Sequence, residues 1–425
     1  MAIIFLIFII FLLLRIPIAF VLGIVSIIYI VVSNNLGLLN TAPQRLFSGL
    51  QNYGLLAIPL FMLAGELMNS GGITARLVNF AKSFVGHFRG GLAYVNVIAN
   101  TFLASIIGSA AAQIAMMSKV MVPAMEKEGY KREFSTATTA TAGLLGPFFP
   151  PSMLFIIYSV GSGASIGAMF MAGIIPGILF AAAIMCLIAY IGYKEKWQTH
   201  EKTPWKERGK SLIYVLPALL VPAIMILGIV TGAFTPTESA AIANVIAVIV
   251  GFFMYKELKI KDIPSIIVNT VTSTATVTML IGMASLFGWV LAFEQIPQLI
   301  AESMTSFTDN KFMFLLLVNI FLLIVGMFLD GIAALIILVP IFMPILPLYG
   351  VDPIHFGVII CINLTIGLLT PPVGSGLFIA SSITKVSIES LTKSLWPFLV
   401  ASIVVLLILT YFEQLVLFIP SLLNS

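Results

Sequence analysis

The sequence predicts an all-helical protein that crosses a membrane many times, built from two inverted repeats that each hold a re-entrant hairpin and a broken helix. Hydrophobic residues make up 60% of the 425 residues and charged residues only 9%, whereas a soluble protein carries roughly 25% charged residues. Apolar runs as long as a spanning helix, about 20 residues, recur along the chain. Two of them are interrupted at matching places by glycine and proline, which a membrane helix tolerates only inside protein or beside a wet cavity.

The chain is predicted to begin with membrane helices and one helix that lies along the membrane surface. Residues 1–32 are apolar except for Arg15. At about 1.5 Å per residue this stretch is too long for one span, so we expect a short helix, a turn at Arg15–Pro17 and a second helix. Residues 46–68 form the next expected span. Residues 71–89 place apolar residues at helical spacing beside basic residues, which indicates an amphipathic interfacial helix.

The first repeat is expected to contain a hairpin followed by a broken helix. Residues 90–127 are apolar but divided at Ile107-Gly108-Ser109, and basic residues flank both ends. We therefore expect two short helices that enter and leave on one side of the membrane. Residues 133–163 form the broken helix, and its break runs over residues 143–152, which include three prolines. Residues 166–192 form a further span.

A basic loop predicts the orientation of the chain. Residues 194–210 carry six lysines and arginines, and loops of this kind stay on the cytoplasmic side. Residues 211–230 and 238–255 are expected to form two spans joined by an outer loop. The three lysines that follow, up to Lys261, return the chain to the cytoplasmic side.

The second half repeats this plan with the opposite orientation. Residues 266–293 are expected to span the membrane and residues 297–307 to lie along its surface. A second hairpin, residues 312–346, is divided at residues 326–331, and its flanks are not basic, so its mouth is expected on the outer side. Residues 354–383 form the second broken helix. One hairpin opens inward and the other outward, which makes the repeats inverted.

Short sequence matches align the two repeats. Gly143-Leu144-Leu145 matches Gly367-Leu368-Leu369, which lies 224 residues later. The segment at 120–125 likewise resembles the segment at 339–344. We name each hairpin tip together with the break of the same repeat a tip–break junction, the first formed by residues 107–109 and 143–152 and the second by residues 326–331 and 367–376.

The two tip–break junctions are the candidate sites for ions and substrate. Unwound carbonyl groups and helix C-terminal ends attract cations, and helix N-termini attract anions. Hard cations such as sodium prefer oxygen ligands, and these segments supply hydroxyl and carbonyl oxygens. We expect sodium to bind through Ser105, Gly108, Ser109, Pro147 and Pro150 in the first junction, and through Gly326, Met327, Asp330, Thr370, Pro371, Val373 and Gly374 in the second. We expect an anionic substrate between them to contact Ser109, Ala110, Ser152, Asp330, Gly331, Gly374 and Ser375.

Several of these residues also have a purely structural interpretation. Glycine and proline can bend helices for close contact alone, and Asp330 can cap the helix that begins at Gly331. Lys119 either extends to the inner interface or attracts an anionic substrate. Glu66 is interpreted as a residue at the inner end of its span.

Other function classes find little support in the sequence. A passive channel would need a continuous polar pore, but polar side chains are sparse. An intramembrane enzyme would need catalytic groups, and no nucleophile motif stands out. The sequence has no GxxxxGK[ST] loop for a nucleotide, so an ion gradient or a partner must supply energy. The three histidines lie in separate segments, so we expect no transition metal, and the expected coupling ion, sodium, is the only cofactor. The net charge of +4 is concentrated in a few loops, which indicates membrane orientation, so we expect no binding of nucleic acid.

Several motifs resemble the large membrane subunit of TRAP transporters, the tripartite ATP-independent periplasmic transporters. They are GAFTPTESAA at 232–241, IPLFMLAGELM at 58–68, GMFLDG at 326–331 and GLLTPPVG at 367–374. The resemblance covers nearly the whole chain. It implies a sodium-driven importer of organic acids that works by an elevator movement in the lipid of a bacterial inner (cytoplasmic) membrane. It further implies two partners, a separate small membrane subunit of four helices and a periplasmic binding protein that delivers the substrate.

The sequence of the first hairpin tip indicates which members of that family this chain resembles most. The family's tip commonly reads Ser-Gly-Ser-Ser, whereas this chain has Ile107-Gly108-Ser109-Ala110. Two hydroxyls are therefore missing, and backbone carbonyls are expected to coordinate sodium at this tip. The segment at 108–113 is similar to sialic acid members, which implies N-acetylneuraminate as the substrate. A C4-dicarboxylate subunit and a stand-alone sodium/dicarboxylate symporter are the alternatives.

The resemblance also implies a division into a fixed scaffold and a mobile transport domain. The expected parts are, in order, scaffold helices with an interfacial helix at 1–89, a first transport-domain repeat at 90–192, a loop with scaffold helices and a second interfacial helix at 193–310, a second transport-domain repeat at 311–385, and a scaffold helix at 386–425 with its span at 394–411.

Overall fold

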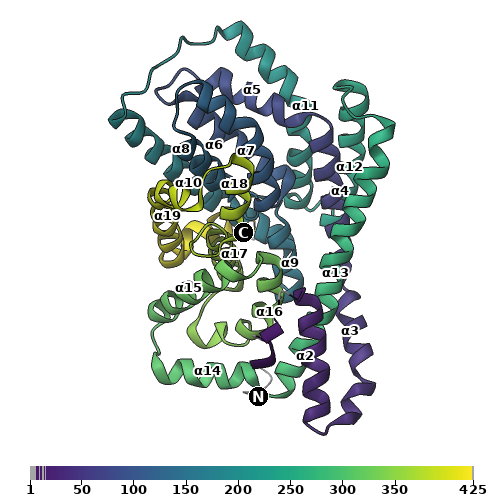
Figure 1. Ribbon diagram of the computed structural model, residues 1–425. Coiled ribbons are helices and arrows are strands. Elements are labelled where there is room, and N and C mark those ends of the chain that lie inside the picture. Colours follow the sequence, from purple (N-terminus) through teal and green to yellow (C-terminus); the bar gives the residue numbers. More distant parts are fainter. Residues whose placement is uncertain (1–5, 9, 12–13, 15, 424–425) are drawn as a thin grey trace.

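The computed structural model describes residues 6–8, 10–11, 14 and 16–423, and every regular element in that part of the chain is helical (Figure 1). Seven helical segments within it are long and apolar enough to cross a membrane. They are Tyr53–Ser70, Ile166–Lys194, Trp205–Val230, Pro236–Met254, Ile260–Phe293, Lys311–Phe328 and Ile388–Tyr411. The predicted all-helical, polytopic fold is confirmed.

The helices before the first hairpin differ in one place from the prediction. The elements are α2 (Ile18–Val32), η1 (Leu36–Asn40), α3 (Ala42–Leu50), η2 (Tyr53–Leu56), α4 (Ala57–Ser70) and α5 (Ile73–Val85). The predicted single span at 46–68 is wrong, because α3 ends at Leu50 and a new helical segment begins at Tyr53. Asn52 lies between the two segments, and its side chain accepts a hydrogen bond from Gly54 N at 2.8 Å and caps the second segment. In the predicted turn at Arg15–Pro17, Arg15 lies outside the described residues.

The first hairpin and the first broken helix occur where the sequence predicts them. The elements are α6 (Gly91–Ile107), α7 (Ala110–Lys127), α8 (Arg132–Gly143), α9 (Met153–Ser162) and α10 (Ile166–Lys194). Helix α6 ends at Gly108, which has a φ of +63°, a conformation that glycine adopts readily. The hairpin therefore turns at a residue without a side chain.

The middle of the chain forms long helices and a shorter helix where residues 297–307 were expected to lie along the membrane surface. The elements are α11 (Trp205–Val230), α12 (Pro236–Ile249), η3 (Val250–Met254), η4 (Ile260–Asp262), α13 (Ile263–Phe293) and α14 (Ile296–Phe307). Helix α12 begins with a reciprocal cap in which Glu238 N donates to Thr235 Oγ1 and Thr235 N donates to Glu238 Oε2. The structure thus gives Glu238 a capping role. Figure 1 places α5 near the upper end of the molecule and α14 at the lower end.

The second repeat has the same order of elements. They are α15 (Lys311–Phe328), α16 (Gly331–Phe342), η5 (Leu346–Tyr349), α17 (Pro353–Gly367), α18 (Ser375–Thr384), α19 (Ile388–Tyr411) and α20 (Glu413–Leu423). The helical part of the second hairpin ends at Phe342, four residues before the predicted end at 346. Helix α19 begins at Ile388, six residues before the predicted start of the last span.

The structure shows how the two repeats align. The first hairpin helices end at Ile107 and Phe328, and the residues that cap the second hairpin helices are Ser109 and Asp330. Each of these pairs is 221 residues apart, as are Pro150 and Pro371. Gly143 and Gly367 are 224 residues apart, and each is the last residue of the helix before its break, so the predicted match holds there. The offset changes because α17 is three residues longer than α8.

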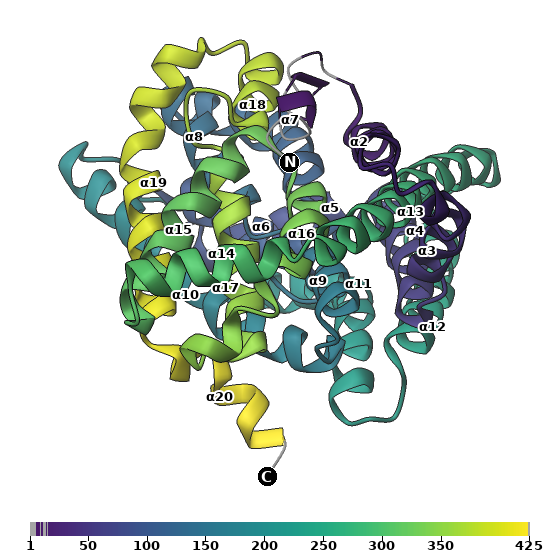
Figure 2. The ribbon, with the colours of Figure 1, turned by 90° about the horizontal axis from the view of Figure 1, so that it is seen from below.

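The two repeats pack crosswise on each other. Helix α9, which follows the first break, contacts α16 of the second hairpin, and α18, which follows the second break, contacts α7 of the first hairpin. Helices α2, α3, α4, α12 and α13 form a column on one side of this body (Figures 1 and 2). The crosswise contacts place both tip–break junctions in the middle of the molecule, beside that column.

Candidate functional site

A cavity of about 270 Å³ lies where the two hairpin tips approach each other. The first hairpin contributes residues 107–112 and Met116, and the second contributes Asp330–Ile332. Pro147, Met153 and Leu154 come from the first broken helix, and Thr365 and Leu368 from the second. Both junctions thus border one space, which we call the central cavity.

The first tip presents a helix N-terminus to the central cavity. Ser109 precedes α7, and its hydroxyl accepts a hydrogen bond from Ala112 N at 3.4 Å. Gly108 lies against the start of α9, since a Cβ on this glycine would be 3.6 Å from Met153 N. The N–H groups of the first turn of α7 therefore face the cavity with their partial positive charge.

The second tip has the same geometry with a charged cap. Asp330 precedes α16, and its Oδ2 accepts a hydrogen bond from Ile332 N at 3.1 Å. The side chain of Asp330 is exposed because it opens onto the central cavity. A Cβ on Gly331 would lie 3.3 Å from Leu154 Cδ1. Met153 and Leu154 are therefore wedged between the two tips.

The two breaks are closed by different interactions. In the first, the buried Ser152 hydroxyl donates to Pro147 O and accepts from Phe155 N at 3.3 Å, so one side chain spans the break and caps α9. In the second, Gly376 N donates to Leu368 O at 2.9 Å. A Cβ on Gly374 would lie only 2.4 Å from Leu368 O. A residue without a side chain is therefore required there.

The central cavity brings together six of the predicted site residues. They are Gly108, Ser109, Ala110, Pro147, Asp330 and Gly331. Ser105 borders a small neighbouring void that also touches Gly108. The other predicted residues are not part of the cavity lining, namely Pro150, Ser152, Gly326, Met327, Thr370, Pro371, Val373, Gly374 and Ser375. Of these, Gly326 is buried against Leu364 O, 2.9 Å from where its Cβ would lie.

The opposite wall of the cavity consists of residues that the sequence interpretation missed. Glu66 and Asn69 of α4, together with Asn269, Thr270 and Ser273 of α13, line this wall. Glu66 faces the cavity, a role that the sequence interpretation did not give it. The signal was present in the sequence, because polar residues at i, i+3 or i, i+4 share one face of a helix. Lys119, by contrast, is exposed and does not line the cavity.

The charge of the cavity lining is negative. Glu66 and Asp330 are its acidic residues, and none of the lining residues is a lysine, arginine or histidine. Three helix N-termini, those of α7, α9 and α16, meet at the same place. The arrangement therefore offers oxygen ligands for cations and main-chain N–H groups for an anion. Within the described residues, no three histidines, cysteines or carboxylates gather into a transition-metal site.

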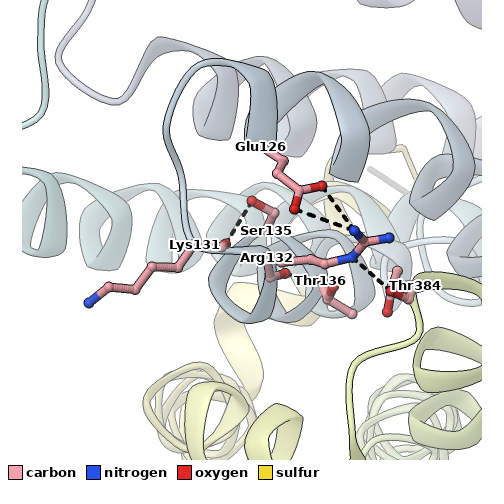
Figure 3. Close-up of polar contacts among 6 residues, drawn as sticks. All are labelled: Glu126, Lys131, Arg132, Ser135, Thr136 and Thr384. Atoms are coloured by element: carbon pink, nitrogen blue, oxygen red, sulfur yellow. Dashed lines mark hydrogen bonds and ion pairs between the residues drawn. The ribbon is translucent and has the colours of Figure 1, made fainter.

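A polar cluster links the repeats away from the cavity. Arg132, the first residue of α8, donates through Nε to Thr384 O at the end of α18, at 2.8 Å (Figure 3). Its Nη1 pairs with Glu126 Oε2 at 3.1 Å. A cation at the C-terminal end of a helix interacts favourably with the carbonyl groups there. Arg132 therefore connects the first broken helix to the second.

Comparisons with known proteins agree with this architecture. The family model described as "Tripartite ATP-independent periplasmic transporter, DctM component" matches residues 5–415. A sialic acid TRAP transporter large permease protein, SiaM of Vibrio cholerae, is 39% identical over 406 residues, which cover 96% of this chain and 95% of the relative. A C4-dicarboxylate TRAP transporter large permease protein, DctM of Pseudomonas aeruginosa, is 38% identical over 377 residues, covering 89% and 88% of the two chains.

A solved structure shares the fold. The YdaH transporter of Alcanivorax borkumensis matches with a TM-score of 0.61 over 89% of each chain, at 14% sequence identity. The family match places the chain in the inner (cytoplasmic) membrane as a transporter subunit and not an enzyme. With matched repeats around one cavity and a family match over nearly its whole length, the chain belongs to the DctM family, the large permease component of tripartite ATP-independent periplasmic transporters.

Proposed function

We propose that this subunit uses an inward sodium gradient to import an organic acid, with N-acetylneuraminate as the first candidate. The observation that carries the proposal is the central cavity, where both hairpin tips, parts of both breaks and three helix N-termini border one space. A site of this kind, between discontinuous helices of two repeats, is where secondary transporters bind substrate and coupling ions.

Sodium is proposed to bind at the two tip–break junctions. Carbonyl groups left free at the breaks, the Ser109 hydroxyl and the Asp330 carboxylate are oxygen ligands of the type that hard cations prefer. The acidic lining of the cavity supports this assignment, since an anionic substrate cannot approach two carboxylates without accompanying cations.

The substrate carboxylate is proposed to bind where α7, α9 and α16 begin. Main-chain N–H groups at these termini favour an anion without any basic side chain. The likeness to the Vibrio cholerae sialic acid subunit supports N-acetylneuraminate. A C4-dicarboxylate is the second candidate, supported by a likeness of nearly equal identity to the Pseudomonas aeruginosa subunit.

Transport is proposed to follow an elevator movement. The mobile domain would consist of the repeats at 90–192 and 311–385, and residues 1–89, 193–310 and 386–425 would form the scaffold. The crosswise contacts of α9 with α16 and of α18 with α7 support the movement of both repeats as one body. The column that contains α4 and α13 would supply the fixed wall of the cavity.

Two partners are proposed from membership of the family. A small membrane subunit of four helices would extend the scaffold, and a periplasmic binding protein would deliver the substrate. Dependence on the binding protein distinguishes this assembly from a stand-alone sodium/dicarboxylate symporter.

Uptake into proteoliposomes tests the proposal. The vesicles would contain this chain and its small partner, and labelled N-acetylneuraminate uptake would be measured with and without an inward sodium gradient and the binding protein. We expect uptake only when both are present. Sodium-driven uptake without the binding protein would support a stand-alone symporter. Uptake of labelled succinate in place of N-acetylneuraminate would assign the C4-dicarboxylate class, and uptake that is indifferent to sodium would overturn the coupling.

A further inference from the structure

Gln113 is a wholly buried polar side chain directly behind the first tip. It lies on α7, four residues after Ser109, and its exposed fraction is 0%. Burying an amide in an apolar segment is costly unless its groups find partners. Neither the predicted sodium ligands nor the lining of the central cavity includes this residue.

The orientation of the Gln113 amide is determined by its neighbours. Its Nε2 donates to Asn100 O at 2.6 Å and to Asn100 Oδ1 at 2.9 Å. A main-chain carbonyl can only accept a hydrogen bond, so the nitrogen must face Asn100. The same logic orients Asn100, whose Nδ2 donates to Asn96 O at 2.8 Å, and Asn96 Nδ2 donates in turn to Thr139 Oγ1 at 2.7 Å. This relay of buried amides joins α6, α7 and α8.

The other end of the amide, Gln113 Oε1, has no hydrogen-bond donor among the described residues. It points toward the first break, because a Cβ on Gly146 would lie 2.7 Å from it. Ser109 O is 3.3 Å from the same point. Because Gly146 has no side chain, the first break can lie close to this amide oxygen and to the main-chain oxygen of Ser109. A buried acceptor without a donor calls for a partner of another kind, such as a cation.

We propose that Gln113 Oε1 is a ligand of the sodium ion at the first tip–break junction, an inference that rests on the proposed sodium coupling. Glutamine carbonyl oxygens are among the ligands of hard cations. Gln113 lies one turn after Ser109 on α7 and supplies an oxygen to the same junction. The amide relay holds this oxygen in place, since both Nε2 bonds prevent the group from rotating.

The test compares sodium with potassium at equal ionic strength. The thermal midpoint of the purified complex reports cation binding, because a ligand that binds only the folded state stabilises it. We expect Gln113→Met, which keeps the length of the side chain but lacks the amide, to lose most of the sodium-specific rise in midpoint. In proteoliposomes the sodium concentration for half-maximal uptake should rise about ten-fold, the size seen when a metal site loses a supporting group.

Two further variants separate coordination from structural damage. Thr139→Val removes the far end of the relay but leaves Gln113 Oε1 in place, so its sodium response should match the wild type. Gly146→Ala places a Cβ 2.7 Å from Gln113 Oε1 while Gln113 is retained. Its response should therefore be lost as in Gln113→Met, and it serves as the test if Gln113→Met does not fold. A wild-type response in both Gln113→Met and Gly146→Ala, or an equal loss in Thr139→Val, would overturn the proposal. A wild-type protein indifferent to sodium in both assays would overturn the proposed coupling itself.

Discussion

The two repeats share one backbone plan but differ in the chemistry of their junctions. The first tip is capped by the neutral Ser109 and the second by the carboxylate of Asp330. The first break is closed by the Ser152 side chain, whereas the second has Gly374 at the equivalent helix start and no side-chain cap. The geometry of the site is therefore nearly symmetric, and its charge is not.

This difference indicates how each junction holds its shape. A side chain that bridges a break, as Ser152 does, can be replaced at the cost of a hydrogen bond. A main-chain contact that leaves no room for a Cβ, as at Gly374, cannot be relieved by rotating a side chain. We therefore expect the second junction to be the less tolerant of substitution.

The largest effect is expected for Gly374→Ala. The new Cβ would lie 2.4 Å from Leu368 O and would push the second break out of position. A displacement of about 1 Å at a reacting site can cost about 100-fold in rate, and we expect a loss of uptake of that order in proteoliposomes. Gly288→Ala is the matched control, because its nearest neighbour would be 3.8 Å away. Equal uptake by the two variants at equal insertion would show that the second break is not part of the site.

The second largest effect is expected at the hairpin tips, where substitutions of Asp330 and Ser109 can be compared directly. Asp330→Ala removes a carboxylate from the cavity and should reduce sodium-driven uptake about ten-fold or more, the loss seen when a metal site is weakened. Ser109→Ala removes a proposed sodium ligand that carries no charge, together with a cap worth about 1 kcal/mol, so uptake should fall less than in Asp330→Ala, by only a few-fold. Asp330→Asn keeps the cap and separates capping from charge. If Asp330→Asn transports as well as the wild type, the charge of the second tip has no role.

A smaller effect is expected on the wall opposite the tips. Glu66→Gln keeps the shape of a residue that lines the cavity from α4, and the loss of one polar contact is worth about 1 kcal/mol. The sodium concentration for half-maximal uptake should therefore rise a few-fold, because one of the two carboxylates of the lining is lost, while the KM for substrate at saturating sodium stays as in the wild type. Uptake kinetics measured at saturating sodium and at saturating substrate separate the two effects. A change confined to the KM for substrate would show that Glu66 contacts the substrate and does not attract the ion.

The smallest effect is expected where the repeats are joined at their ends. Arg132→Ala removes the bond to Thr384 O and the pair with Glu126, both partly exposed to solvent. Such interactions contribute about 1 kcal/mol or less. The thermal midpoint of the purified complex should fall by a few degrees with uptake nearly unchanged, and Glu126→Gln should have a smaller effect still. A collapse of uptake in Arg132→Ala would mean that this link, and not the crosswise helix contacts, holds the repeats together.

Much of the fold could be predicted because its determinants are local. Prolines and glycines mark the breaks, and long apolar runs mark the spans. The separation before Tyr53 was missed because the polar residues Gln51 and Asn52 interrupt the apolar stretch only briefly, and the capping bond of Asn52 is visible only in the structure. The identical Gly-Leu-Leu segments correctly marked the ends of α8 and α17, but they did not show that α17 is three residues longer than α8.

The site could be predicted only in part, since it combines local and distant residues. The tips carry a local signature, and six of the predicted residues do line the central cavity. Glu66 and Ser273 come from helices distant in sequence, so only the fold shows that they face the tips. Gly374 does not line the cavity but packs against the main chain at Leu368, and this contact could not be predicted because it depends on the path of the backbone there.

The most direct test of a single site shared by both repeats is the accessibility of the two tips. Ala111 and Ile332 line the central cavity from opposite hairpins. Each would be replaced by cysteine in a Cys186→Ser background, with the buried Cys361 retained. The labelling rate of a water-soluble thiol reagent would be measured in potassium, in sodium, and in sodium with N-acetylneuraminate, using Lys202→Cys in the exposed loop as the control. We predict that sodium with substrate protects both tips together and leaves the loop unchanged. Protection of one tip alone would contradict a shared site.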